Sequence, residues 1–356
     1  MKIGIITGKS GETYRYEELR EMIPKKYYKV NEYGEKEINT DVAIAFSIRH
    51  RFPNIKVDII EPKDISLARL TKNDINYILG FDHVSALNES PYVKKYSGKQ
   101  GVQKLDAIYK NPSSKVFPSF PFLSFIWDKK KYLQTLEKHN IPIIPTLFVK
   151  SNVSIPKLVK DIQAKKWKEF IIKPNGGTEK IGVEKFSIKD ILNDNYDLKN
   201  YIDTNSESYN DFLLQPLING FFKYGEIKTY WMNGNYSYAV NVRDQNTGED
   251  DIIYDDLIRT TENIDHILLQ KCIRIGEKAI EVIPKIGFNK KKVIPAMVRI
   301  DFAFEFKGNS KQPSKIYLNE IEHQDAGSLT DNENISYPYV EIMADTFVKK
   351  AREVGL

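Results

Sequence analysis

Three carboxylates and an arginine have the spacing of a charged cluster on two neighbouring strands. Arg299 and Asp301 lie in the apolar run 296–306, and Glu320 and Glu322 lie in the run 315–322. Because residues two apart share one face of a strand, each pair should project together. Acids that face one pocket repel one another unless a divalent cation lies between them, and oxygen-only ligands suit Mg²⁺, with Mn²⁺ as an alternative. A solvated charged face is the competing interpretation, but the opposite face is apolar, with Ile300, Phe302, Leu318 and Ile321.

A lysine followed by glycines forms the second chemical feature. Lys173 ends the apolar run 169–173, which predicts a strand, and a glycine-rich turn follows with Gly176, Gly177, Thr178 and Gly182. Glycines at this place let backbone amides close over a polyphosphate. An ordinary hairpin loop with a solvated lysine is equally compatible with this segment alone.

Two further segments carry weaker signals. Pro216 lies in the run 213–218 and interrupts a strand ladder, which leaves backbone groups free to bond the edge of an adenine ring. The segment 4–10 looks like a phosphate-binding P-loop, but three residues separate Gly4 from Gly8 where four are required. We therefore interpret it as a flexible loop after the first strand, on the substrate side.

In this order the features resemble the ATP-grasp superfamily over residues 120–328. The resemblance makes Lys129 the first nucleotide lysine, Lys173 the second, and 176–182 the loop that covers the phosphates. It implies that the Gln215 side chain and the Pro216 carbonyl accept from the adenine amino group. The Ile218 N–H would reach the ring, and Glu226 would bind the ribose.

The resemblance extends to the charged cluster. It makes Asp301, Glu320 and Glu322 metal ligands, although the family usually has asparagine where this chain has Glu322. Arg299 corresponds to the arginine that neutralises charge in the transition state. Lys228 and Arg243 are similar to basic residues of the glutathione synthetase and ribosomal-protein glutamate ligase branch, and would assist Arg299.

The function implied by the resemblance is an ATP-dependent carboxylate–amine ligase, related also to D-alanine–D-alanine ligases. Such an enzyme forms an amide or peptide bond through an acylphosphate and releases ADP and phosphate. Its substrates would be a small-molecule or peptide carboxylate and an amine. A kinase acting on a polyol or inositol phosphate remains an alternative, as does a non-catalytic ATP-binding module. His323 is a candidate general base, but a polar loop histidine without that role is the favoured interpretation.

The elements that must position these residues predict an α/β (α+β) protein with the ATP-grasp fold. Strands at 2–7, 56–60 and 76–80 around a helix at 41–51 indicate a βαβ preamble with a parallel sheet. We expect an N-terminal domain at 1–120, a small central lid at 121–208 and a C-terminal antiparallel-sheet domain at 209–356. Within these, 116–125 reads as a connector and 193–210 as a polar surface loop. Helices are expected at 128–140, 264–282 and 339–353.

Composition agrees with a cytoplasmic enzyme of ordinary type. The 356 residues allow two or three domains, and a net charge of +5 argues against a dedicated nucleic-acid binder. Cys272 is the single cysteine, so an intrachain disulfide is excluded. No apolar run approaches the ~18 residues of a membrane span. No nucleic-acid or membrane partner is expected, and a homodimer is the assembly that enzymes of this type commonly form.

Overall fold

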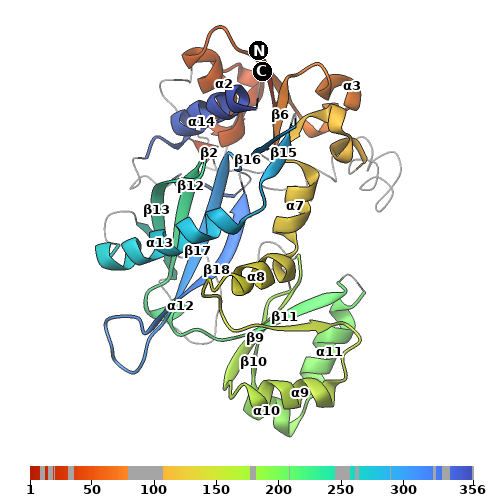
Figure 1. Cartoon of the computed structure of the whole chain (residues 1–356), viewed down its shortest axis with the longest axis vertical. Helices are drawn as coiled ribbons and strands as arrows, with labels where there is room; N and C mark the ends of the chain where they lie inside the picture. The colour runs from red at the N-terminus through yellow and green to blue at the C-terminus, as the bar shows by residue number, and fades with distance from the viewer. Residues whose placement is uncertain are drawn as a thin grey trace.

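The computed structural model describes residues 1–8, 13–14, 19, 21–30, 36–78, 107–176, 182–207, 209–244, 257–260, 264–288, 290–323, 326–330 and 337–354. These residues form three units that follow one another along the long axis of the molecule (Figure 1). The described part of the chain contains no helix that is both long and apolar enough to cross a membrane.

The N-terminal unit is built on a four-stranded parallel sheet. Its order is β5 (Lys56–Ile60), β1 (Lys2–Ile6), β6 (Ile75–Ile78) and β7 (Val116–Phe117). The helix α2 (Thr40–Arg51) lies between β1 and β5 in the chain, as the βαβ pattern predicts. Gly4 is glycine for packing reasons, because a Cβ there would lie 1.9 Å from the Asn76 Oδ1 atom. The later residues of the P-loop-like segment, Lys9 and Ser10, lie outside the described residues.

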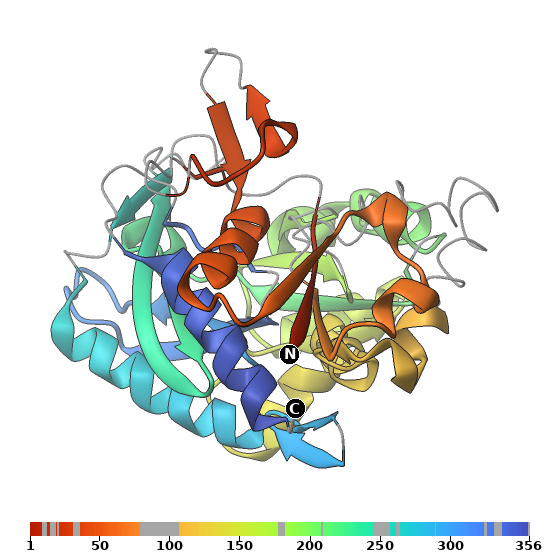
Figure 2. The same cartoon turned by 90° about the horizontal axis from the view of Figure 1, so that it is seen from above.

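Short elements complete this unit. A three-stranded antiparallel sheet, which the sequence pattern did not reveal, projects from the body in Figure 2. Its strands are β2 (Thr13–Tyr14), β4 (Lys36–Asn39) and β3 (Tyr28–Val30). The helix α3 (Leu67–Leu70) and 3₁₀ turns at Lys25–Tyr27, Pro62–Asp64 and Pro112–Ser114 make up the rest.

The central unit, which we call the lid after its expected role, is an antiparallel sheet with helices on one face. Its strands are β10 (Glu184–Ser187), β9 (Glu169–Pro174), β11 (Asp211–Pro216) and β8 (Leu147–Lys150), in that order. The helices α9 (Ile155–Ala164), α10 (Ile188–Asn193) and α11 (Tyr196–Asn205) pack against Phe170, Ile172, Phe212 and Leu214 of the sheet. The predicted polar loop at 193–210 is wrong, because Leu198, Tyr201 and Ile202 have helical spacing and are buried. Since β11 belongs to this sheet, the lid also extends beyond the boundary expected at residue 208.

The C-terminal unit is a five-stranded antiparallel sheet. Its order is β14 (Leu257–Thr260), β13 (Asn235–Asp244), β12 (Glu226–Met232), β17 (Met297–Glu305) and β18 (Lys315–His323). The helix α13 (His266–Val282) packs on one face, where Gly276 allows it to approach the buried Trp231 ring. The helix α12 (Gly220–Lys223) contacts β17 and β13 of this sheet. The hairpin of β15 (Ile286–Phe288) and β16 (Lys291–Val293) lies near β6 of the N-terminal unit (Figure 1), where Phe288 contacts the Phe117 ring.

Three more helices join the units. The expected connector at 116–125 is wrong: it holds β7 and then α7 (Phe120–Trp127), whose Pro121 lies in the first turn, where a helix tolerates proline. The helix α8 (Lys129–Lys138) follows directly. The last helix, α14 (Tyr339–Glu353), packs beside α2 of the N-terminal unit (Figures 1 and 2).

Candidate active site

The predicted charged cluster forms on one face of the C-terminal sheet. In the β17–β18 pair Arg299 lies opposite Glu322 and Asp301 lies opposite Glu320, while Lys228 of β12 lies opposite Asp301. Carboxylate oxygens of Asp301, Glu320 and Glu322 all lie within 4.8 Å of one another. Strand alternation therefore brings together the residues that it predicted.

A β-bulge at Asn319 shapes the same strand pair. Glu320 opposes Asp301, but Leu318 opposes Phe302, so Asn319 is the extra residue. The bulge explains how Leu318 and Ile321 both face the core although they are three residues apart. The Asn319 side chain donates to the Glu226 Oε1 atom at 2.8 Å. Asn319 is a site residue that strict alternation does not predict, because alternation does not reveal a bulge.

Basic side chains pair with every acid of the cluster. Asp301 accepts from Arg299 at 2.9 Å and from Lys228 at 2.6 Å, and it is almost completely buried. Arg299 also contacts Glu322 at 2.9 Å, and Lys228 contacts Glu226 at 3.2 Å. Glu320 pairs with Lys129 from the first turn of α8.

These contacts and burial shift the ionisation of the cluster. Burial raises the pKa of Glu322 to about 7, and the charges of Glu320 and Asp301 add to the rise against the attraction of Arg299. Burial also disfavours ionised Glu320, but Lys129 and Lys173 outweigh it and lower its pKa to about 2. Burial disfavours charged Arg299 and Lys228, yet the nearby carboxylates together outweigh burial and raise the pKa of both: Asp301 and Glu322 act on Arg299, and Asp301 and Glu226 act on Lys228. The pKa values of the two glutamates are therefore shifted in opposite directions although the residues are only two apart.

Lys173 lies on the lid face opposite the helices. It is paired in register with Leu213, and its neighbours Phe170 and Ile172 face the helical layer. Burial lowers the pKa of Lys173 to about 8, and repulsion from Lys129 adds to this against attraction from Glu320 and Glu226. Within the described part of the chain, no carboxylate forms an ion pair with its ammonium.

The glycine-rich turn begins and ends in left-handed backbone. Gly176 has φ of 84° and Gly182 has φ of 74°, a region that favours glycine. Gly177 and Thr178, which were predicted to contact phosphate, lie outside the described residues.

Asn175 joins this turn to the first turn of α8. Its side chain accepts from the Lys130 N–H at 3.0 Å and donates to Asp128 Oδ1 at 2.9 Å. Asp128 in turn caps α8 by accepting from the Lys131 N–H at 3.0 Å. Lys129 is the first residue of α8, and Lys173 lies two residues before Asn175. The Asn175 amide therefore connects the two segments of backbone that carry these lysines. The role of Asn175 is not predictable from the sequence, because its partners are distant in the chain.

Gln215 lies on the same lid face as Lys173, paired in register with Ile171. Its side chain is buried and donates through Nε2 to the Thr146 hydroxyl at 3.0 Å. Its Oε1 atom is buried and has no hydrogen-bond partner among the described residues. Pro216 ends β11, and the buried Ile218 joins a small apolar cluster with Ile144, Ala303 and Tyr317.

Two predicted candidates lie away from the cluster. Val242, rather than Arg243, opposes Glu226, so alternation directs Arg243 to the opposite face from Lys228. His323 is the last residue of β18 rather than a loop residue. It opposes Val298, is buried, and its ring lies 6.4 Å from that of Trp127.

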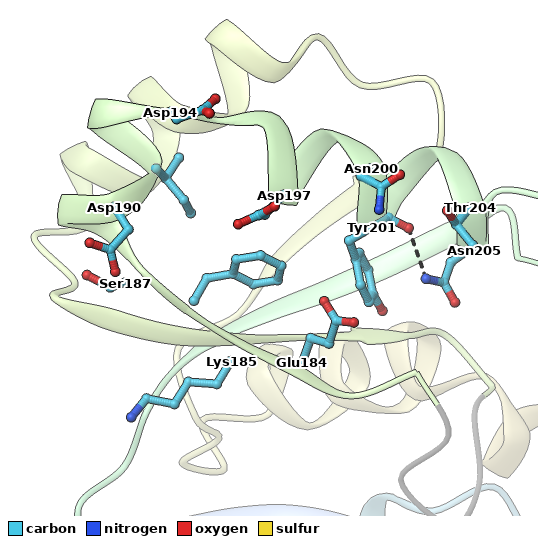
Figure 3. Close-up of a pocket in the computed structure, with 12 residues that line it drawn as sticks. Glu184, Lys185, Ser187, Asp190, Asp194, Asp197, Asn200, Tyr201, Thr204 and Asn205 are labelled. Carbon is cyan, nitrogen blue, oxygen red and sulfur yellow. Dashed lines mark hydrogen bonds between the residues drawn. The ribbon is translucent and has the colours of Figure 1, made fainter. Parts of the chain in front are cut away.

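A separate hollow of about 480 Å³ lies on the lid, between β10 and the helices α10 and α11 (Figure 3). Acidic side chains line it, among them Glu184, Asp190 and Asp197. Burial and the charge of Asp197 raise the pKa of Glu184. None of the predicted site residues lines this hollow.

The donor set of the cluster fits a hard divalent cation. Asp301, Glu320 and Glu322 offer only carboxylate oxygens, which Mg²⁺ and Mn²⁺ prefer, and no histidine or thiol is part of the group. The basic residues around them would also suit phosphate oxygens.

Comparison with solved structures identifies the fold. The chain is similar to D-cycloserine synthetase DcsG, with a TM-score of 0.63, 13% identity and coverage of 99% of this chain and 100% of that one. It is similar to D-alanine–D-alanine ligase from Bacillus anthracis complexed with ATP, with a TM-score of 0.59, 14% identity and coverage of 99% and 98%. It is also similar to the ATP-grasp ligase PsnB complexed with minimal precursor, Mg and ADP, with a TM-score of 0.57, 14% identity and coverage of 98% and 97%. No protein-family model matches the sequence, and no curated protein matches it significantly. The chain has the ATP-grasp fold, which confirms the fold class expected from its motifs.

Proposed function

We propose that this protein is an ATP-dependent carboxylate–amine ligase that forms an amide bond through an acylphosphate and releases ADP and phosphate. The observation that carries the proposal is the convergence of Asp301, Glu320 and Glu322 beside Arg299 on one sheet face. The structurally similar proteins named above include ligases and a synthetase, which supports the same class of reaction.

The lysines and the hinge residues would bind ATP. Lys129 and Lys173 lie close to each other and to Glu320, and both would hold phosphate oxygens. The unpartnered Gln215 Oε1 atom supplies an acceptor for the adenine amino group. Glu226, which Lys228 and Asn319 hold in place, would bind the ribose hydroxyls.

Arg299 and Lys228 would stabilise charge during phosphoryl transfer. The attacking carboxylate oxygen forms a bond to the γ-phosphorus, the bond to the bridging oxygen breaks, and ADP leaves. Because Asp301 already holds these positively charged side chains in place, little reorganisation is needed during the transfer of the phosphoryl group. When bound, Mg²⁺ would supply charge neutralisation on the β- and γ-phosphates. The amine would then attack the acylphosphate carbonyl carbon, give up a proton, and release phosphate.

The test is a substrate panel with Mg-ATP. Amino acids, short peptides and polyols are each incubated with the protein, with and without hydroxylamine, and ADP, phosphate and hydroxamate are measured. A ligase gives ADP and phosphate together, and hydroxylamine converts the acylphosphate to a hydroxamate that identifies the acid.

Other outcomes distinguish the alternatives. ADP with a phosphorylated polyol and no free phosphate would show a kinase. Nucleotide binding without turnover across a panel that includes the true substrate class would show a non-catalytic module.

A further inference from the structure

A short hydrogen-bond relay fixes the orientation of the Gln215 amide. The Thr146 hydroxyl donates to the Ile144 carbonyl oxygen at 2.7 Å, and Gln215 Nε2 donates to the same hydroxyl oxygen at 3.0 Å. A hydroxyl has one proton. Because Thr146 gives that proton to Ile144, its oxygen can only accept from Gln215, so the amide NH₂ must face Thr146. The amide oxygen therefore points the other way.

The amide oxygen is the unsatisfied end of this relay. Gln215 is 1% exposed, and its Oε1 atom has no hydrogen-bond partner among the described residues. A buried acceptor without a donor is costly, so such an atom indicates a missing partner. The side chain lies on the lid face that carries Lys173. Ile144, whose carbonyl anchors the relay, also belongs to a small apolar cluster with Ile218.

We propose that Thr146 is a positioning residue that makes this site select adenine nucleotides over guanine nucleotides. The inference rests on the proposed function, in which the site binds ATP. Adenine has an amino group at C6 that donates to Oε1. Guanine has a carbonyl oxygen there, so two acceptors would face each other and Oε1 would stay unpaired.

The relay matters because residue 215 is a glutamine. A carboxylate would accept a hydrogen bond in either orientation, whereas an amide that turned over would present NH₂ to the ligand. A turned amide would accept guanine and reject adenine. Thr146 prevents that turn.

The experiment compares Mg-ATP and Mg-GTP binding by titration calorimetry in the full chain. Thr146→Val keeps the side-chain shape but removes the hydroxyl, so the amide is free to turn. We expect the ratio of ATP affinity to GTP affinity to fall about tenfold or more, the effect of one buried hydrogen-bond mismatch. Thr146→Ser keeps the hydroxyl and should keep the ratio close to that of the wild type.

A second substitution separates orientation from packing. Gln215→Glu in the Thr146→Val background supplies an acceptor in either orientation and should restore the preference for ATP. An unchanged ratio of ATP affinity to GTP affinity in Thr146→Val would overturn the inference. An equal loss of affinity for both nucleotides that Gln215→Glu does not reverse would overturn it too. In either case, ATP binding by the wild type would leave the proposed function standing. Absence of nucleotide binding by the wild type would instead contradict the proposed function itself.

Discussion

At the scale of single residues, Lys173 links ATP binding to pH. Its pKa of about 8 reflects burial and repulsion from Lys129. Bound phosphate would favour the charged form and raise this pKa. Below pH 8 the free protein already carries the proton, so affinity is insensitive to this group. Above pH 8 binding must take up a proton, so the dissociation constant for ATP should rise with pH, by up to about tenfold per unit.

The measurement is ATP binding between pH 7 and 9.5 in the wild type and in Lys173→Met. The variant should bind ATP more weakly at pH 7 and should lose the rise above pH 8. The same slope in both proteins would show that another group carries the pH dependence.

The sequence predicted the charged residues of the site better than their polar supports. Arg299, Asp301, Glu320 and Glu322 follow from alternation on two strands, and the structure confirms that they converge. The role of Asn319 depends on a bulge, which a two-residue period does not contain. The face on which Arg243 lies depends on the register between β12 and β13. That register places Arg243 on the opposite face of the sheet from Lys228.

At the scale of elements, the amide of Asn175 holds the start of α8 against the end of β9. Asn175→Ala removes an acceptor from the Lys130 N–H and a donor to Asp128. Loss of a hydrogen bond typically costs about 1 kcal/mol, so the dissociation constant for ATP should rise about fivefold through misplacement of Lys129. Calorimetry with Mg-ATP measures this change.

Lys130→Met is the matched control for that variant. It removes the ion pair of Lys130 with Asp211, which measures 3.1 Å, but leaves the backbone N–H on Asn175. ATP binding by this control should stay close to that of the wild type. Equal weakening in both variants would contradict a specific role for the Asn175 amide.

The elements themselves were predictable where periodicity was strong. The strands β9, β17 and β18 and the helices α2, α13 and α14 lie within two residues of their expected bounds. The helix α11 was missed because polar residues surround its few apolar ones, and their burial against the lid sheet decided the structure. The strand β11 belongs to the lid sheet because it pairs with β9 and β8, and a local sequence pattern does not predict which strands pair.

At the scale of the whole molecule, α14 ties the two ends of the chain together. Phe347 is fully buried and stacks on Tyr77 of β6 at 4.0 Å between ring centroids, while the Tyr77 hydroxyl donates to the Phe347 carbonyl at 2.7 Å. Arg51 of α2 pairs with Asp345 of α14 at 2.7 Å. The C-terminal helix is therefore part of the N-terminal core.

Phe347→Ala should consequently lower the free energy of unfolding by about 3–5 kcal/mol. Urea denaturation followed by circular dichroism measures the change, and Phe347→Leu, which fills most of the volume, should cost clearly less. A loss under about 1 kcal/mol for the alanine variant would show that α14 contributes little to this core.

At the same scale, the acidic cluster of the C-terminal sheet is the proposed binding site for Mg-ATP. The most direct measurement is calorimetric titration of Mg-ATP into the wild type, Glu320→Gln and Glu305→Gln. Glu305 lies at the far end of the same strand pair, where it bonds Tyr317 and Lys315. We predict that the wild type and Glu305→Gln bind Mg-ATP alike, and that Glu320→Gln binds it at least about tenfold more weakly because one oxygen ligand loses its charge. Equal binding by all three proteins would contradict Mg-ATP binding by this cluster.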